Sequence, residues 1–414
     1  MARTVAELPK GARITDYISL GVIAEKIPLK HIQQVLQETG RESQRQRNLP
    51  AHVVVYYVVA LALYMQSSYG EVLRCLCEGL QWLGLEARRI RRTGKSGISQ
   101  ARSRLGAEPM RRLYEGLVGP LAQQRTRGAF YRSWRLVSLD GSTLDVADEA
   151  ANEQAYGRPG SSRGRSAFPK IRFTALVENG THVLFGAQMD GYHTGELTLA
   201  GRTLAWLKAG MLCLADRGFF SFEFWCKAGA TGADLLWRVQ GNAVLPCRKA
   251  LPDGSYLSRI YPSPADRRND RKGVCVRVVE YCLRGSRHPD QVYRLITTLL
   301  DPDQAPACEL AALYHQRWEI ETTFDALKTH LRGRQIVLRS KTPELVCQEF
   351  FGLMLAHFAV RSLMHEAALQ ADLDPDQLSF LHSVRVLRRK ISGPVSFPPS
   401  ADPSDPPGSS GGDP

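Results

Sequence analysis

The sequence predicts an α/β fold, a mixed sheet with helices on both of its faces. Lys170 to Glu178 and Thr181 to Met189 alternate in polarity around Asn179-Gly180, and Asn-Gly between such strands signals a hairpin. Met211 to Ala215 (MLCLA) is entirely apolar, as in a strand buried on both faces. The predicted order is three antiparallel strands, helix, strand, helix, strand and a late helix, which suits a mixed sheet.

Residues 1–130 are predicted to be helical and to form an N-terminal DNA-binding domain. A helix should begin near Pro50, because Asn48 is of N-cap type and Pro is tolerated in a first turn. The most apolar run, Ala51 to Met65, is too short to span a bilayer comfortably, so we expect a buried helix. A second helix is predicted from Tyr69 to Leu83.

A basic segment lies between Arg88 and Arg112, where Glu108 is the only acid. Its core, SGISQARSRLG, has a Ser of N-cap type followed by Ser, Gln and Arg, as in a helix that reads DNA. A solvated basic helix is the alternative. The predicted DNA contacts in this segment are Arg88, Arg89, Arg91, Arg92, Arg102 and Arg104.

The first part of the catalytic domain is predicted over residues 131–239. Trp134 to Asp145 reads as an apolar strand that delivers Asp140 and then turns at Gly141. A polar loop over residues 146–169 precedes the hairpin, and Glu196 to Lys208 follows it as a helix. A helix over Ser221–Ala228 and a strand over Leu235–Val239 complete this part.

The remainder of the chain divides into four predicted segments. Residues 240–300 form a β insertion with strands near Val274–Cys282 and Val292–Leu299, and residues 301–345 hold the second catalytic part. Residues 346–392 form a helical C-terminal region, with helices over Pro343–Leu369 and Asp376–Lys390. The Pro-, Ser-, Gly- and Asp-rich tail, 393–414, is predicted to be disordered.

Composition favours a polyanion as partner. Lys+Arg number 54 against Asp+Glu 41, a net charge of +13, which is typical of proteins that bind nucleic acid. The nine cysteines are scattered without a CxxC pair, which argues against a zinc site or a disulfide scaffold and for a reducing interior. The start leads into no apolar signal core, so we expect a cytoplasmic, nucleoid-associated protein without a membrane partner.

The stretch Leu310 to Leu331 reads as one amphipathic helix around which the site is organised. On a wheel of about 100° per residue, four polar side chains share a stripe roughly 60° wide beside an apolar stripe. They are Tyr314, Arg317, Glu321 and Lys328. A carboxylate flanked by cations suits a metal ion with phosphates beside it. The alternative is a surface helix with solvated charges.

Two aspartates complete the predicted site. Asp140 follows the first strand and Asp216 the buried fourth one, and strand ends in an open sheet form ligand sites that Glu321 could pack across. Alternatively, Asp140 is a turn residue and Asp216 a helix cap. Three converging carboxylates repel one another unless a cation lies between them. Hard oxygen ligands select Mg²⁺, with Mn²⁺ as a substitute, and two ions would serve phosphoryl transfer. The other polar side chains of the stripe would hold phosphates.

The motifs resemble those of the DDE transposases of the insertion-sequence-four family. The resemblance lies in Asp140-Gly141, in Asp216-Arg217-Gly218-Phe219, and in the Y-(2)-R-(3)-E-(6)-K spacing of the late helix, which matches without a gap. It extends through the N-terminal region, Phe168-Pro169 and the turn at Leu251-Pro252-Asp253-Gly254-Ser255, over roughly residues 12 to 392.

This resemblance implies a ribonuclease-H-like catalytic fold with the β insertion before the Glu321 helix. It implies hydrolysis at the transposon end, attack by the 3′-OH, a hairpin intermediate in related enzymes, and strand transfer into target DNA. It also implies a homodimer on paired terminal inverted repeats. Trp318 stands where similar enzymes carry an aromatic residue near the DNA end, although it could equally be a packing residue.

The sequence therefore predicts a metal-dependent transposase of a bacterial-type insertion sequence, with Asp140, Asp216 and Glu321 as its catalytic metal ligands. One alternative is a catalytically inactive DNA-binding repressor derived from a transposase. A host nuclease on the same fold, without strand transfer, is another.

Overall fold

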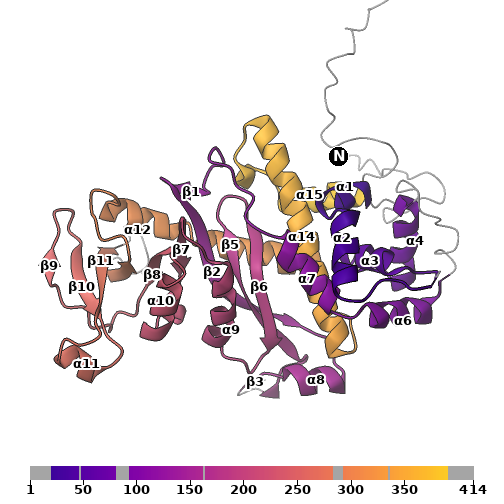
Figure 1. Ribbon diagram of the computed structural model, residues 1–414, viewed down its shortest axis with the longest axis horizontal. Coiled ribbons are helices and arrows are strands. Elements are labelled where there is room, and N and C mark those ends of the chain that lie inside the picture. Colours follow the sequence, from indigo (N-terminus) through magenta and orange to yellow (C-terminus); the bar gives the residue numbers. More distant parts are fainter. Residues whose placement is uncertain are drawn as a thin grey trace, which may run out of the picture.

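The computed structural model describes residues 20–45, 48–80, 93–161, 164–282, 292–333 and 336–389. A helical region lies at one end of the molecule, a large sheet at its centre, and a strand extension with a small helix at the other end (Figure 1). The long helix α14, Pro343–Ala371, runs between the helical region and the sheet and packs on both.

The helical region contains six helices among the described residues. They are α1 (Leu20–Lys26), α2 (Leu29–Glu38), α3 (Ala51–Leu63), α4 (Tyr69–Leu80), α6 (Lys95–Leu105) and α7 (Glu108–Leu117). Helix α3 begins directly after Pro50 and is buried from Val53 to Leu63, because it packs against α14, α4 and α2. None of the helices in the described ranges is both long and apolar enough to cross a membrane.

The central sheet has the strand order β6-β5-β2-β7-β8. Strands β2, β5 and β6 are antiparallel neighbours, whereas β2, β7 and β8 are parallel. Their bounds are β2 Trp134–Asp145, β5 Lys170–Glu178, β6 Val183–Gly191, β7 Met211–Ala215 and β8 Asp234–Arg238. Three antiparallel strands followed by two parallel ones confirm the predicted ribonuclease-H-like α/β fold.

The predicted β insertion continues this same sheet. Strand β12 (Val292–Thr297) pairs antiparallel with β8, and β11 (Val274–Cys282), β10 (Tyr256–Ile260) and β9 (Lys249–Ala250) follow in order. The connecting helices are α9 (Glu196–Thr203), α10 (Phe222–Gly229) and α11 (Pro264–Arg268). Small elements complete this region: β1 (Phe130–Tyr131), α8 (Ala150–Tyr156), β3 (Gly160–Ser161) and β4 (Gly164–Arg165).

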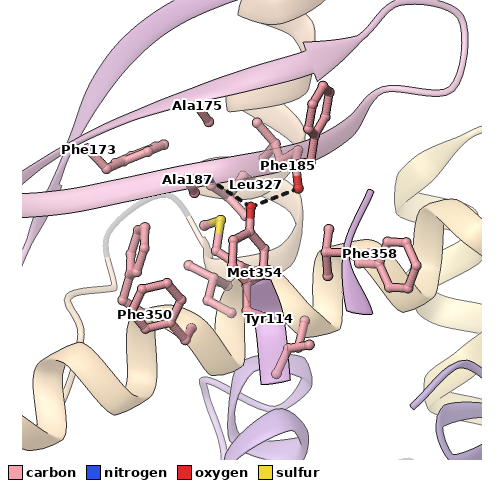
Figure 2. Close-up of a cluster of buried hydrophobic side chains, with 14 of the residues drawn as sticks. Tyr114, Phe173, Ala175, Phe185, Ala187, Leu327, Phe350, Met354 and Phe358 are labelled. Atoms are coloured by element: carbon pink, nitrogen blue, oxygen red, sulfur yellow. Dashed lines mark hydrogen bonds between the residues drawn. The ribbon is translucent and has the colours of Figure 1, made fainter. Parts of the chain in front are cut away.

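Helices cover both faces of the sheet. On one face, α14 and α7 pack against β5 and β6, and the buried hydroxyl of Tyr114 donates to the Leu184 carbonyl and accepts from the Ala187 amide, each at 3.1 Å (Figure 2). Further along the same face, α12 (Ala307–His315) packs over Leu212 and Leu214 of β7. On the other face, Thr203 of α9 hydrogen-bonds to Thr174 of β5, and Phe224 of α10 packs against Trp237 of β8. Strand β7 is therefore buried along its whole length, as its composition predicts.

The predicted helix Leu310–Leu331 is wrong as a single helix. The chain forms α12, then α13 (Trp318–Asp325), then a π-helical segment, Ala326–Gly333. The interruption lies at Gln316 and Arg317, whose amides donate to the Leu313 and Tyr314 carbonyls, three residues back, so the helix is tightened there. Both helices pack on the same face, α12 over Leu212 and Leu214 and α13 against Phe173. The tightened turn and the π-helical segment change the rotation per residue, so a single 100° wheel does not describe these side chains.

The C-terminal region ends in a 3₁₀ turn, Pro375–Gln377, and α15, Phe380–Arg389. The predicted helix from Asp376 therefore starts four residues late, after the turn. Strand β2 also departs from its prediction. It does not turn at Gly141, because residues 141–145 go on pairing with β5, from Gly141↔Thr174 to Asp145↔Lys170.

Candidate active site

Two neighbouring parallel strands bring Asp140 and Asp216 together. The pairing of β2 with β7 ends at Leu139↔Ala215, and the next residue in each strand is one of the two aspartates. Asp140 lies in mid-strand, paired with Ala175 of β5, whereas Asp216 leaves β7 and begins a 3₁₀ turn, Arg217–Phe219. The sheet itself therefore places both carboxylates at the point where β2 and β7 separate.

The alternative roles of the two aspartates, a turn residue for Asp140 and a helix cap for Asp216, are not observed. Asp140 is not in a turn, although its Oδ1 accepts a hydrogen bond from its neighbour, the Gly141 amide, at 2.8 Å. Asp216 makes no capping hydrogen bond, and its Oδ1 is buried without a hydrogen-bond partner among the described residues. Burial raises the pKa of Asp140 to about 6, opposed by the Gly141 N–H and the Arg317 charge, and supported by the charges of Glu196 and Asp216.

Arg317 connects Asp140 to Glu321. Its Nη1 lies 3.7 Å from Oδ2 of Asp140, and its Nη2 lies 3.3 Å from Oε1 of Glu321. The guanidinium is only 11% exposed, and the nearby charge of Asp216 also stabilises it. The three predicted acids thus surround one largely enclosed cation. Glu321 is the outermost of them, with a side chain that is 45% exposed.

The other residues of the late-helix signature take different positions. Tyr314 is buried, and its hydroxyl donates to the Ala215 carbonyl at 3.2 Å, so it supports the end of β7 beside Asp216 and does not face solvent. This position does not support the predicted phosphate contact of Tyr314. Lys328 is half-buried in the π-helical segment and interacts electrostatically with Asp140, while burial lowers its pKa. Trp318 is 60% exposed beside Arg317, so it is not a packing residue in this structure.

A fourth carboxylate, Glu196, was not anticipated from the sequence. It lies in the first turn of α9, and its charge acts on Asp140. A Cβ atom at Gly141 would stand 2.2 Å from Oε1 of Glu196, so the glycine of the Asp-Gly motif leaves the space this carboxylate occupies. The sequence does show an acid at the start of the helix that follows the third strand. Its approach to Asp140 is visible only in the folded structure, because it depends on how the chain connects β6 to α9.

The donor set fits a hard divalent cation. Carboxylate oxygens are the ligands that Mg²⁺ and Mn²⁺ prefer, and the unpartnered Oδ1 of Asp216 offers a buried lone pair at the site. Among the described residues, only His182, Glu319 and Asp376 hold three candidate ligand atoms within 4.8 Å of one another. Asp140, Asp216 and Glu321 are more widely spaced, with the Arg317 guanidinium between them.

The predicted N-terminal DNA contacts divide into three groups. Arg88, Arg89, Arg91 and Arg92 lie outside the described residues. Arg104 is exposed on α6, whose first residue is Lys95, so the helix begins ahead of the Ser expected as its cap. Arg102 is buried, and its guanidinium donates to Gln348 at 2.8 Å and Ser340 at 2.9 Å. The structure therefore gives Arg102 a packing role and does not support its predicted contact with DNA.

The chain is similar to known transposases over most of its length. Residues 17–115 match the family described as insertion element 4 transposase N-terminal, and residues 134–359 match the transposase DDE domain. The chain is 28% identical over 364 residues to the transposase InsG for insertion sequence element IS4 of Escherichia coli K12, covering 87% of this chain and 80% of that protein. It is 27% identical over 223 residues to the putative transposase InsZ of the same strain, covering 53% and 71%.

Among solved structures, the piggyBac transposase in a synaptic complex with hairpin DNA is similar. The TM-score is 0.44 at 11% identity, over 91% of this chain and 78% of that one. A likeness this remote carries no conclusion about the site.

Proposed function

The chain belongs to the insertion-sequence-four family of DDE transposases, and from that premise we propose that it cleaves DNA at the ends of its own element and joins them to target DNA. The observation that carries this proposal is the meeting of Asp140, Asp216 and Glu321 around Arg317. We further propose that the enzyme binds terminal inverted repeats as a homodimer and acts within the nucleoid.

In this proposal Asp140, Asp216 and Glu321 supply the hard oxygen ligands of divalent cations. The cations would activate the attacking oxygen and stabilise the leaving one. The protein supplies the positions of these ligands. Pairing of β2 with β7 fixes the two aspartates, and the Tyr314 hydroxyl holds the end of β7 through the Ala215 carbonyl.

The cations of the chain would act on the DNA backbone. The planar guanidinium of Arg317, which contacts carboxylates in this structure, has the donor geometry to bind a phosphate instead. Lys328 lies in the π-helical segment near Asp140. These contacts would position the scissile strand without reading its sequence.

Trp318 gives the site an exposed aromatic surface beside Arg317. An indole in this position could stack on a base freed at the cleaved end, a contact that does not depend on sequence. Arg104, and the four arginines before residue 93, remain proposed contacts to the terminal repeat. Their contribution would be salt-sensitive, since phosphate contacts release counterions.

The test uses the full chain, a labelled duplex carrying the element's terminal repeat, and a supercoiled target plasmid with Mg²⁺. A transposase yields cleavage at the repeat end and labelled DNA joined to the plasmid. Cleavage without joined product would indicate a nuclease. Binding of the duplex with neither product, in Mg²⁺ and in Mn²⁺, would indicate the DNA-binding repressor instead.

A further inference from the structure

The tip of the β5–β6 hairpin is buried, although hairpin tips usually face solvent. Asn179 is 0%, Thr181 2% and His182 4% exposed, and Gly180 is also buried. The tip spans residues 179–182, so it is longer than the two-residue Asn-Gly turn that the sequence suggests. A tip enclosed in this way does more than reverse the chain.

Three hydrogen bonds join this tip to the segment that carries Arg317 and Glu321. Asn179 Nδ2 donates to the Gln316 carbonyl at 3.2 Å, just before Arg317. The Gly180 amide donates to Glu319 Oε2 at 2.6 Å, and His182 Nδ1 lies 2.8 Å from Thr323 Oγ1. The last two contacts stand two residues before and two residues after Glu321.

The same tip holds the strand of Asp140. Oδ1 of Asn179 accepts a hydrogen bond from Ser138 Oγ at 2.9 Å, and Ser138 lies on β2 two residues before Asp140. The Asn179 amide thus joins β2 to the start of the late helical segment. The chain elements that carry Asp140, Arg317 and Glu321 are therefore all hydrogen-bonded to the tip of the β5–β6 hairpin.

The role of His182 Nδ1 as a hydrogen-bond donor follows from its partner, Thr323. The single hydroxyl proton of Thr323 is donated to the Glu319 carbonyl at 2.7 Å, so Thr323 Oγ1 must accept from His182 Nδ1–H. On the other side of the ring, Nε2 contacts Asp376 Oδ1, so a second proton is shared between this nitrogen and the carboxyl group, and the contact orients the imidazole. His182 therefore acts on α13 as a fixed hydrogen-bond donor.

A metal ion is the competing explanation for this cluster, since ligand atoms of His182, Glu319 and Asp376 lie within 4.8 Å of one another. Positive charge already faces them, however. Arg361 is buried and interacts electrostatically with both carboxylates, while its guanidinium stacks 4.5 Å from the centre of the Phe380 ring. In the described part of the chain, both ring nitrogens of His182 and the carboxylates of Glu319 and Asp376 already have protein partners, so the cluster is accounted for without a metal ion.

We propose that Asn179, Gly180 and His182 are positioning residues that hold Arg317 and Glu321 against the strand of Asp140. The inference rests on the proposed function, because it explains how that site keeps its geometry. None of the three residues contacts DNA or the reacting atoms in this proposal. They act through α13 and β2.

The test compares three substitutions of His182 in the full chain. Asn places an amide donor near the position of Nδ1, so His182→Asn keeps the bond to Thr323, whereas the longer His182→Gln places its amide near Nε2 and loses that bond. His182 has a φ of 58°, a left-handed conformation that Asn and Gly tolerate. His182→Gly is therefore the control that keeps the backbone and removes the side chain.

Two readouts are taken from each variant. The first is amide hydrogen exchange of residues 318–325, which requires no activity and reports how firmly α13 is held. The second is the single-turnover cleavage rate, together with the Kd for terminal-repeat DNA. We expect the Gln and Gly variants to exchange about tenfold faster in α13 and to cleave about tenfold more slowly, with an unchanged Kd, and the Asn variant to resemble wild type.

Equal behaviour of the Asn, Gln and Gly variants in both readouts would overturn the inference, as would unchanged exchange in α13 in the Gly variant. Stoichiometric zinc in the purified chain that the Gly variant loses would also overturn it. A failure of the proposed function looks different. Wild type would then not cleave, while exchange in α13 would still follow the order Asn slower than Gln and Gly.

Discussion

One guanidinium, that of Arg317, lies against the carboxylates of both Asp140 and Glu321, with Nη1 3.7 Å from Asp140 and Nη2 3.3 Å from Glu321. Asp140 belongs to the central strand β2, and Arg317 lies at the break between α12 and α13. The break that interrupts the late helix therefore places its arginine in the site.

Arg317→Ala should reduce the cleavage rate by roughly 10–100-fold, because two contacts to charged partners are lost. Arg317→Lys should retain part of the rate, since an ammonium keeps the charge but cannot contact two partners as a planar fork. Cleavage rates are measured on labelled terminal-repeat DNA, with the Kd determined in parallel. Full activity of the Ala variant would exclude Arg317 from the site.

Gly141→Ala should impair cleavage by crowding Glu196, since the new methyl group would stand 2.2 Å from Oε1. If this contact is the cause, the loss disappears once Glu196 is shortened. We expect Gly141→Ala to cost about tenfold in the wild-type background and little in the Glu196→Ala background. Losses that simply multiply in the double variant would show that Gly141 acts independently of Glu196.

Trp318→Ala should weaken the interaction with the cleaved DNA end by roughly tenfold, the low end of what loss of one base-stacking contact costs. Its side chain is 60% exposed, so the free energy of unfolding should change by less than about 0.5 kcal/mol. Trp318→Phe is the matched control that keeps a ring. Binding is measured with pre-cleaved terminal-repeat DNA, and equal affinity of the Ala and Phe variants would argue against stacking.

His357 should make the protein less stable in acid. Its ring is fully buried, neither nitrogen has a hydrogen-bond partner among the described residues, and burial lowers its pKa well below the ordinary value. Below about pH 6.5 the unfolded chain binds a proton that the folded protein does not, so stability falls by about 1.4 kcal/mol per pH unit for this group.

Replacing His357 with Leu should flatten that pH dependence without loss of a hydrogen bond. His52, His182 and His365 also have lowered pKa values, so part of the dependence remains in the variant. Urea unfolding at pH 7.5 and pH 5.5 measures the difference. The same fall in stability in wild type and variant would show that His357 is not one of the groups responsible.

The parts of the fold that depend on local pattern were predictable from the sequence. Strand β7 begins and ends at the predicted residues. Its five apolar side chains can all be buried only in a strand covered on both faces, and the run is bounded by Gly210 and Asp216. The Asn179-Gly180 hairpin was also predicted. The use of its tip to hold α13 was not, because that depends on contacts with a segment far along the chain.

The features that were missed all depend on tertiary packing. The tightened turn at Gln316 and Arg317 accompanies the hydrogen bond from Asn179 to the Gln316 carbonyl, a contact that a helical wheel cannot show. Arg102 was expected at a DNA surface, and only the course of α14 shows that its guanidinium is enclosed by Gln348 and Ser340. Glu196 was missed because its nearness to Asp140 depends on the crossover after β6.

The most direct test of the central claim is Mg²⁺-dependent cleavage of terminal-repeat DNA by wild type and by the variants Asp140→Asn, Asp216→Asn and Glu321→Gln. Each substitution removes one charge and keeps the shape of the side chain. We predict cleavage by wild type, a loss of at least about 1,000-fold in every variant, and a Kd for DNA within a few-fold of wild type. Cleavage at the wild-type rate by any one variant would contradict the assignment of that carboxylate to the site.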